Sequence, residues 1–369
     1  MKQGSKRLYA LLPLLAAAAL AVLVGVDYQN TKKAARQVTA QYSWLGWDAF
    51  DTITNVIGNA QSEEEWNSQM QAFHEDLLEY HRLYDIYNTY EDVVNLANVN
   101  EMAGKGPVQV DERIIALLQE AKAVYAQTNG KTNVAIVTNV AAGAVLSLWH
   151  DARTAGLENA QNAALPSEQA LQQAAGHCNI EDLVIDEAAG TVELKDPAMR
   201  LDVGSIGKGY AVEQCARAAE QRGLASASIS VGGNIRTIGL RADGTGWSLG
   251  VEDPRDQNSQ TALYALSLPG GQSLVTSGDY QRYYTVNGEK YHHLIDLQTL
   301  YPARYWNSVT VIAPDSGLAD GLSTGLFCMD YEQGRALAES LPGVEVCWVR
   351  IEDGKVKAQF TEGFKEKLQ

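Results

Sequence analysis

Apolar side chains recur at helical spacing in two stretches of the first half of the chain. Between Ser62 and about Leu83 they lie three and four positions apart, which predicts a helix with one face on a core. Ser62 and Glu65 have the spacing of a capping box at the start of this helix. A second helix is predicted from Asp111, an N-cap residue type, to the breaker at Gly130.

Short runs rich in apolar and β-branched residues, typical of strands, dominate the second half of the chain. They predict strands at 182–186, 191–194, 225–231, 235–240, 246–252, 261–268, 272–276, 283–286, 291–296, 308–313, 344–351 and 355–360. Asn287-Gly288 separates two of them and is a strong hairpin signal. An earlier strand is expected at 50–57, ended by Gly58, and further helices begin at Ser167, Ser316 and Tyr331. Long strand runs with few helices indicate an α+β fold. We expect a single large mixed domain, and a boundary within 156–167 remains an alternative.

The N-terminus has the pattern of a membrane-targeting segment. Three basic residues within the first seven precede an uncharged run from Leu8 to Val26. That run comes close to the roughly 20 residues that span a bilayer. We therefore expect a signal anchor or signal peptide at 1–27, a polar linker at 28–46 and the folded domain at 47–365. The expected location is the cell membrane, with the soluble domain outside the cytoplasm.

Charge and cysteine content narrow the function classes. The formal net charge of −16 argues against a nucleic-acid partner, because nucleic-acid-binding proteins carry basic patches. Hydrophobic residues make up 46% of the chain, which is enough for a sizeable core. The four cysteines form no zinc-binding pattern and are expected to be buried thiols. A disulfide between Cys328 and Cys347 is the alternative.

The most informative polar stretch runs from Leu201 to Ala216 and has the pattern of a strand end, a glycine turn and a helix start. Its glycines follow the order Gly204-x-x-Gly207-x-Gly209, which reverses the dinucleotide fingerprint, and no Ser or Thr follows Lys208 as in a Walker A loop. Free N–H groups at a helix start attract anions. Lys208 adds positive charge and Asp202 a carboxylate. The stretch suits a phosphate and its metal, although an ordinary glycine-rich turn would have the same pattern.

Three later stretches carry further candidate chemistry. Residues 276–282 form either a ligand-contacting loop or a polar turn between strands. His293 is a candidate base because its reference pKa is near neutral, whereas two adjacent strand histidines are more often structural. Asp320 and Thr324 lie four positions apart on a predicted helix and so share one face. A carboxylate and a hydroxyl there suit Mg²⁺ with phosphate oxygens, or else serve as a first-turn charge and a packing residue.

Together these stretches resemble the ApbE-type flavin transferases, the FAD:protein FMN transferases. The resemblance runs from about Phe50 to Phe360, and the order and spacing of its motifs are more specific than any single motif. It is carried by Asp202–Tyr210, Val231–Asn234, Thr276–Tyr280, His293–Asp296 and Ala319–Thr324. It implies a single large mixed α+β domain of the ApbE type behind an N-terminal membrane anchor.

The resemblance implies an activity. The chain would split FAD at its pyrophosphate with Mg²⁺, join FMN through a phosphoester bond to a Ser or Thr hydroxyl of a target protein, and release AMP. The expected acceptor is a flavoprotein that carries a Ser/Thr flavinylation motif, in a membrane redox complex. No segment of the type Asp-x-x-Ser/Thr-Gly-Ala-Ser/Thr is obvious in the chain itself. Two alternatives stay open: an Mg²⁺-dependent FAD pyrophosphatase that gives FMN and AMP, and a non-catalytic flavin-binding protein.

The resemblance also implies site residues. His293 is the expected base, and Asp296 is the second expected catalytic residue. The residues expected to contact FAD are Phe50, Tyr87, Lys131, Thr132, Asn133, Asp202, Lys208, Asp279 and Ile295. The expected metal ligands are Ser205, through its backbone oxygen, Asp320, Ser323 and Thr324. The family's usual Met-Gly-Thr and Phe-Asp motifs appear here as Phe50-Asp51-Thr52 and Thr132-Asn133, and Leu297 and Leu300 replace a Pro and a Gly.

Overall fold

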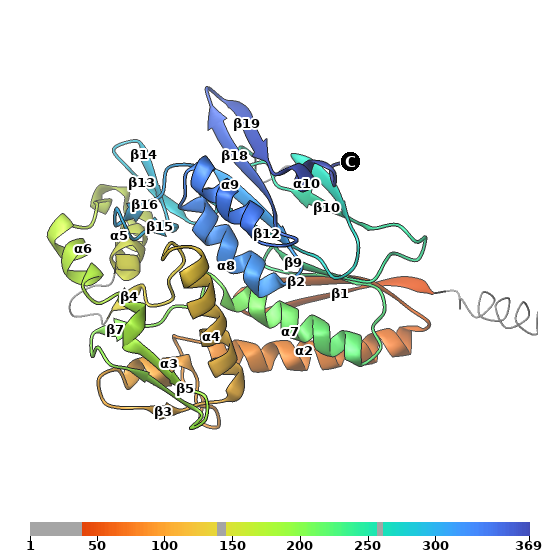
Figure 1. Cartoon of the computed structure of the whole chain (residues 1–369), viewed down its shortest axis with the longest axis horizontal. Helices are drawn as coiled ribbons and strands as arrows, with labels where there is room; N and C mark the ends of the chain where they lie inside the picture. The colour runs from red at the N-terminus through yellow and green to blue at the C-terminus, as the bar shows by residue number, and fades with distance from the viewer. Residues whose placement is uncertain (1–38, 139–144, 257–260) are drawn as a thin grey trace, which may run out of the picture.

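The centre of the computed structural model is an eight-stranded sheet in which every neighbouring pair of strands is antiparallel (Figure 1). The structure describes residues 39–138, 145–256 and 261–369. In spatial order the strands are β1 (Ala40–Ala49), β2 (Thr52–Ala60), β8 (Ala227–Val231), β9 (Asn234–Ile238), β12 (Ser273–Gly278), β17 (Ser308–Ala313), β18 (Glu345–Glu352) and β19 (Lys355–Phe360). This sheet with its helices forms the single α+β domain expected from the sequence.

Helices cover one face of the sheet, and a small hairpin with a short helix covers part of the other. Val275 and Val311 pair across β12 and β17 and pack with Leu322 of the helix above them. Leu274 and Ile312, one residue along, point to the opposite face because side chains alternate along a strand. There they pack with the hairpin and the short helix. The covering elements are α8 (Ser316–Phe327) on the first face, and β10 (Trp247–Val251), β11 (Tyr264–Leu268) and α10 (Glu362–Lys365) on the second.

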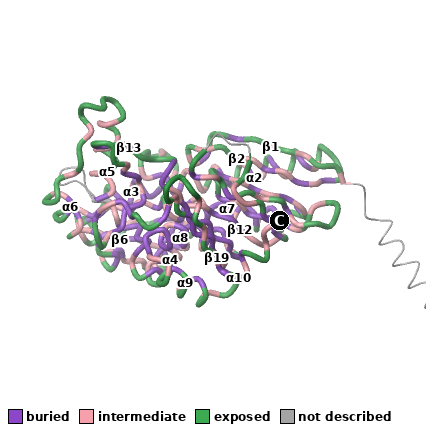
Figure 2. The backbone as a smooth tube through the Cα atoms, turned by 90° about the horizontal axis from the view of Figure 1, so that it is seen from above, coloured by how far each residue is buried: buried purple, intermediate pink, exposed green. Residues whose placement is uncertain are grey.

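Three long helices lie beside one another along the first face (Figure 1). They are α2 (Glu63–Tyr84), α7 (Gly207–Gln221) and α8, with α4 (Glu112–Gln127) and α9 (Tyr331–Ser340) flanking them. Ser62 caps α2 by accepting a hydrogen bond from the Glu65 N–H, and Asp111 caps α4 by accepting one from the Arg113 N–H. Both predicted starts are therefore confirmed. Figure 2 shows that the tube of α7 and α8 is largely buried.

The remaining elements form a layer at one end of the sheet and include the segments expected to contact the ligand. Asn287-Gly288 joins two strands in a hairpin, as predicted. The predicted strand 291–296 is interrupted at His293 and Leu294. The elements are α3 (Leu96–Glu101), β3 (Val108–Gln109), β4 (Val137–Thr138), α5 (Val145–Glu158), α6 (Glu168–Ala175), β5 (Leu183–Asp186), β6 (Thr191–Leu194), β7 (Met199–Arg200), β13 (Tyr283–Val286), β14 (Glu289–His292), β15 (Ile295–Asp296) and β16 (Tyr301–Pro302).

The expected boundaries differ from the structure at both ends of the domain. Residues 40–46 were expected in the linker 28–46, but they belong to β1, because Tyr42 and Trp44 pack on α2 side chains. At the other end the chain stays in the fold beyond 365, since the Gln369 N–H donates to the Ala265 carbonyl. The expected membrane segment, 1–27, and the linker residues 28–38 lie outside the described residues. Among the described residues, no helix has both the length and the hydropathy needed to cross a membrane.

Two further expectations from the sequence are corrected. Gly58 does not end its strand: β2 continues to Ala60, and a Cβ at position 58 would lie 2.7 Å from the Trp66 ring and from the Ser226 carbonyl. Glycine is present there because α2 and β8 approach the strand closely. All four cysteines are buried free thiols, so the alternative disulfide between Cys328 and Cys347 is wrong.

Candidate functional site

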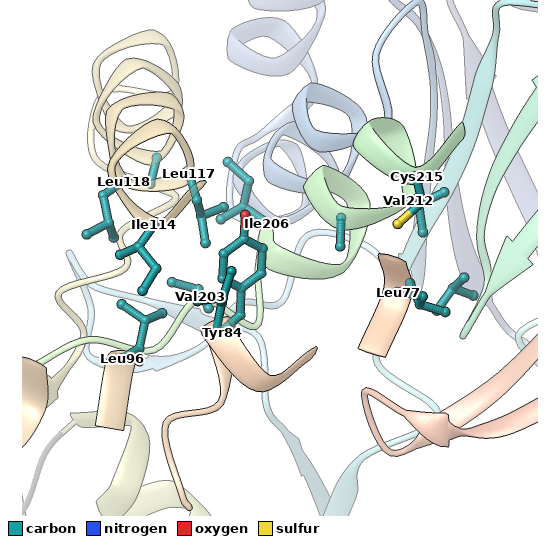
Figure 3. Close-up of a cluster of buried hydrophobic side chains, with 14 of the residues drawn as sticks. Leu77, Tyr84, Leu96, Ile114, Leu117, Leu118, Val203, Ile206, Val212 and Cys215 are labelled. Atoms are coloured by element: carbon teal, nitrogen blue, oxygen red, sulfur yellow. The ribbon is translucent and has the colours of Figure 1, made fainter. Parts of the chain in front are cut away.

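The glycine turn before α7 is held in place by its own apolar residues. Val203 and Ile206 are buried among Tyr84 and Leu117 of the helices below (Figure 3). Asp202 accepts a hydrogen bond from the Gly204 N–H at 2.7 Å through Oδ1. The turn is thus fixed from below, while Gly204 remains exposed at the surface.

The start of α7 meets the middle of α8 directly. The Gly209 N–H donates to Asp320 Oδ2 at 2.8 Å, in a buried position. A Cβ at 209 would lie 2.2 Å from the Ser316 carbonyl oxygen and 2.5 Å from the Asp320 Cβ. Glycine is therefore required for this close helix crossing. Two segments 111 positions apart in the sequence, the phosphate-type turn and the predicted metal carboxylate, lie together as expected.

A buried charge network fixes the same two helices one turn further along. Glu213 of α7 accepts hydrogen bonds from Arg236 Nε at 2.8 Å and from the Ser316 N–H, at the start of α8, at 2.9 Å. Arg217 bonds both Glu213 and Asp315, the N-cap of α8. Each charge in this network has a partner, as buried charges require. It sets the position of α8 relative to α7, and no short sequence motif signals it.

The oxygen atoms around Asp320 can be compared with what a divalent ion needs. Asp320 accepts the Gly209 N–H through Oδ2, so this hydrogen bond does not use Oδ1. Ser205 Oγ is buried and also has no such partner. Thr324 lies one helical turn from Asp320. This donor set fits a hard cation that is completed by ligand oxygens.

Two observations limit the metal prediction. The Ser323 hydroxyl bonds Ser277 Oγ of β12 at 2.8 Å and the Asp320 carbonyl at 2.9 Å, so it holds α8 on the sheet. Its placement therefore argues against a direct metal contact through the side chain. Within the described ranges, no group of three or more His, Cys, Asp or Glu side chains is arranged to hold a metal ion. An ion here would depend on hydroxyl, backbone and substrate oxygens.

The segment 131–134 ties the site together. Lys131 forms a buried ion pair with Asp296, with Nζ at 3.0 Å from both carboxylate oxygens. Thr132 donates to the Gly321 carbonyl of α8 at 2.7 Å. The Asp202 N–H donates to the Val134 carbonyl at 2.8 Å. The predicted residues Lys131, Thr132, Asp202, Asp296 and Asp320 are thus brought together.

Several of these side chains already have protein partners. Asn133 donates to the Cys178 carbonyl and accepts from the Ala135 N–H, which fixes its own loop. Asp279 is bonded to Asn307 at 2.9 Å and ion-paired with Lys290 at 3.1 Å. Ile295 is buried in a core cluster with Trp149 and Tyr291. These contacts give Asn133, Asp279 and the Ile295 side chain structural roles, and their predicted contact with FAD stays a prediction.

Tyr87 is 78% exposed, at the tip of a loop that is held by one carboxylate. Asp85 is buried and accepts hydrogen bonds from the Tyr87 N–H at 2.7 Å, from the Asn88 N–H and side chain, and from the Tyr90 hydroxyl. These bonds lower the pKa of Asp85 although burial raises it. The loop backbone is therefore fixed while the Tyr87 ring stays open to a flat ligand.

Phe50 and Asp51 form the two-residue turn between β1 and β2, and both have positive φ, 55° and 50°. Such angles are strained for residues other than glycine, and bulky residues with positive φ are often found at functional sites. The Phe50 ring lies against His81, and its N–H donates to His81 Nδ1 at 3.2 Å. Desolvation of its hydroxyl raises the pKa of Tyr87, and the carboxylates of Asp202 and Asp51 raise it further.

His292 and His293 have different roles. His292 is buried, with Nε2 at 2.8 Å from the Ala303 carbonyl and Nδ1 accepting the Leu294 N–H. His293 is half-buried, and its Nδ1 has no hydrogen-bond partner among the described residues. Burial, together with Arg282 and His292, lowers the pKa of His293 to about 3. No hydrogen bond joins His293 to Asp296 in the described residues, so the two predicted catalytic groups act separately.

His150, Arg153 and Arg282 lie near the site, and none of them was assigned a role from the sequence. Burial raises the pKa of Asp202, and the opposing charges come from Lys208, Arg282 and His150. Lys208 also points its Nζ to the Gly204 carbonyl at 3.4 Å. Arg153 forms a hydrogen bond to His150 and lowers the pKa of His293 slightly further. In the sequence, His150 follows Trp149 and Arg282 ends the polar stretch 276–282. Neither position predicts that the side chain lies near the site.

Comparisons with known proteins agree with this geometry. The model of the ApbE family matches residues 50–348. The FAD:protein FMN transferase of Treponema pallidum is 34% identical over 71% of this chain and 72% of its own length, and that of Vibrio cholerae is 29% identical over 92% and 94%. The crystal structure of the ApbE protein from Thermotoga maritima has a TM-score of 0.74 at 27% identity, covering 89% of this chain and 100% of that one. The chain therefore belongs to the ApbE family, as its motifs predicted.

Proposed function

We propose that this chain is an FAD:protein FMN transferase, which moves FMN from FAD to a hydroxyl group of a protein. Its relatives in Treponema pallidum and Vibrio cholerae carry this name. The observation that carries the proposal is the 2.8 Å hydrogen bond between the Gly209 N–H and Asp320. It brings the glycine turn with its Lys208 ammonium and the Asp320 carboxylate to one point, as a diphosphate and its counter-ion require.

The reaction breaks the phosphoanhydride bond of FAD and forms a phosphoester bond to the acceptor. The acceptor hydroxyl oxygen attacks the FMN phosphorus, the bond from that phosphorus to the bridging oxygen breaks, and AMP leaves. Phosphoryl transfer depends mainly on positioning and charge neutralisation. The Lys208 ammonium at the start of α7 is suited to hold the phosphate oxygens. The N–H groups of Gly204, Gly207 and Gly209 already donate to Asp202, Val203 and Asp320. His293 is the proposed acceptor of the hydroxyl proton.

Mg²⁺ is the proposed metal, held by Asp320 Oδ1, the Thr324 hydroxyl and the Ser205 carbonyl. When bound, such an ion withdraws charge from the pyrophosphate and stabilises the leaving AMP phosphate. Tyr87 is proposed to stack on the isoalloxazine ring, and its 78% exposure leaves the ring face free to do so.

The protonation state of His293 supports its proposed role. A pKa lowered to about 3 keeps the imidazole neutral at physiological pH and so able to accept a proton. The negative charge of the bound diphosphate would raise this pKa, because an opposite charge favours the protonated form. Substrate binding would thereby make His293 a stronger base when it is needed.

The same proposal includes the cellular setting. Residues 1–27 would anchor the protein to the cell membrane with its folded domain outside the cytoplasm, because a basic start precedes an apolar run there. The acceptor would be a flavoprotein subunit of a membrane redox complex, modified at a Ser or Thr hydroxyl. Both points rest on the sequence pattern and on the family resemblance.

Incubation of the purified protein with FAD, Mg²⁺ and a folded acceptor domain tests the proposal. The acceptor domain carries an Asp-x-x-Thr-Gly-Ala-Thr segment, and a matched domain has both of its Thr residues replaced by Val. The expected result is an acceptor whose mass rises by one FMN less one water, with equimolar AMP, and no change in the Val control. Free FMN with AMP and no adduct would favour the FAD pyrophosphatase, and unchanged FAD would favour a flavin carrier.

A further inference from the structure

The β1 end of the sheet has one face that no described element covers. Tyr42 and Trp44 of β1 point to the helix face, where they contact Trp66 and Phe73 of α2. Leu45 alternates to the opposite face. That face is covered by β10, β11 and α10 around β9, β12, β17, β18 and β19. The outer face of the β1–β2 hairpin is therefore open to solvent.

Three large apolar side chains lie on this open hairpin. Leu45, Trp47 and Ile53 are 59%, 77% and 66% exposed, and together they are called the hairpin patch here. Leu45 pairs with Asn55 and Gly46 with Thr54, and Ile53 lies one residue beyond Thr54 toward the turn. The register shifts between Gly46 and Ala49, so Trp47 lies in an irregular part of β1 beside the same turn. Single exposed apolar residues are common, but a group of them on one face marks an interaction surface. Trp is also among the residues that contribute most to binding energy at protein interfaces.

The hairpin patch is next to the candidate site. The strained turn Phe50-Asp51 follows Trp47 in the chain and contacts His81 at the end of α2. The Gly232 N–H donates to the Ile53 carbonyl at 3.0 Å, which places the patch beside the Val231–Asn234 turn.

We infer that the hairpin patch is where the acceptor protein docks, through an apolar surface beside its modified hydroxyl. This inference rests on the proposed function, because it requires a protein substrate. An acceptor that reaches the site passes the Phe50-Asp51 turn, and the hairpin patch lies beside that turn on the face of the hairpin that points away from α2. A membrane is less well placed, since the chain enters β1 at Ala40 and Trp47 lies seven residues, about 23 Å, further along the strand.

Two variants and a matched control test the inference. Trp47→Ser and Ile53→Ser remove the patch without touching the candidate site. Leu240→Ser is the control, since Leu240 is an apolar residue, 47% exposed, at the far end of the same sheet. Its carbonyl bonds Ser226, which bonds Asn59, and Asn59 lies about 20 Å along β2 from Ile53.

Each variant is assayed with the folded acceptor domain described above and with its Asp-x-x-Thr-Gly-Ala-Thr segment as a short peptide. For Trp47→Ser we expect KM for the folded domain to rise at least about tenfold, as loss of an interface Trp typically causes. The values of kcat, the dissociation constant for FAD and KM for the peptide should stay unchanged. The Leu240→Ser variant should behave like the wild type in every assay.

Direct binding of the folded domain, followed by fluorescence anisotropy, gives the same answer without turnover. If the wild type gave no adduct, the proposed function would fail, while the binding data would still test the patch. Unchanged KM and affinity in both hairpin variants would overturn the inference. So would an equal loss with the peptide, which would make Trp47 part of the site. Two other results would assign the patch to another partner. They are a wild-type dimer, or binding of the folded domain to vesicles, that is lost in Trp47→Ser while KM for the acceptor stays unchanged.

Discussion

Asp320 is an expected metal ligand and Tyr87 an expected FAD contact, and their surroundings differ strongly. Asp320 is buried, bonded to the backbone of α7, and set in place by the Glu213 network. Tyr87 projects from a loop and is 78% exposed. Chemistry at phosphorus needs atoms held within fractions of an ångström, whereas a large ligand must enter over an accessible surface. Variants near Asp320 should therefore lower kcat, and variants near Tyr87 should weaken FAD binding.

The largest effect is expected from substitution of the buried Asp320. Asp320→Ala should reduce flavin transfer by about a hundredfold or more, because removing a residue that holds catalytic charge typically costs that much. Asp320→Asn is the matched variant, since its amide oxygen can still accept the Gly209 N–H and preserve the helix crossing. Adduct formation measured by mass spectrometry at saturating Mg²⁺ reports the loss. Full activity in Asp320→Asn would show that the carboxylate does not hold the metal.

The next effect is expected at His293. His293→Ala should lower kcat by about a hundredfold, the lower range for loss of a general base, while the dissociation constant for FAD stays near that of the wild type. In the wild type, the acid limb of kcat should lie at higher pH than that of kcat/KM. The reason is that bound diphosphate raises the pKa of His293 above its value of about 3 in the free protein. Coincident limbs, or equal loss of transfer and FAD binding in His293→Ala, would assign it a structural role.

A smaller effect is expected in the Tyr87 loop. Asp85→Asn replaces one carboxylate oxygen by an amide NH2 group, so two of the four hydrogen bonds that Asp85 accepts are lost and the loop should loosen. We expect the dissociation constant for FAD to rise about tenfold, roughly 1.4 kcal/mol, with little change in kcat at saturating FAD. Flavin fluorescence titration measures the constant. Asp92→Asn is the control, because Asp92 is an exposed acid of the same region, paired with Arg82. A matching loss in that variant would contradict the role given to Asp85.

The smallest effect is expected in stability at Asp202. Burial raises the pKa of Asp202 above its unfolded value, so ionisation disfavours the folded state, and this cost appears as pH rises above the unfolded pKa of 3.8. Asp202→Asn should therefore raise Tm at neutral pH and lose that advantage below about pH 4. Calorimetric scans across pH measure the difference. A Tm lowered at neutral pH would mean that the Asp202 charge stabilises the fold through its neighbours.

Local signals in the sequence predicted much of the fold. Helix starts at Ser62, Asp111 and Asp315 were visible because an N-cap acts within its own turn. The strand β17 was predicted with its observed bounds. By contrast, the prediction that Gly58 ends its strand is wrong. Glycine is present there because Trp66 and Ser226 lie close to it, and the local sequence does not show these distant contacts. The order of the strands in the sheet depends on such long-range contacts.

The sequence predicted residue types of the candidate site but few of their contacts. The motifs indicated Asp202, Lys208 and Asp320, since each carries a charge in a glycine-rich or helix-start context. That Lys131 pairs with Asp296, or that Ser323 bonds Ser277, depends on segments 165 and 46 positions apart. The Glu213–Arg236 pair was missed for the same reason. A residue type can suggest a role, but only its neighbours in space decide whether it is free to act.

The glycine at position 209 links catalysis to heat resistance. Because no side chain separates α7 from α8, the carboxylate at 320 keeps its place only as long as the two helices stay in contact. The proposed reaction centre has no part that can loosen ahead of the hydrophobic core. On slow heating, activity and near-ultraviolet circular dichroism should therefore disappear in one and the same cooperative transition.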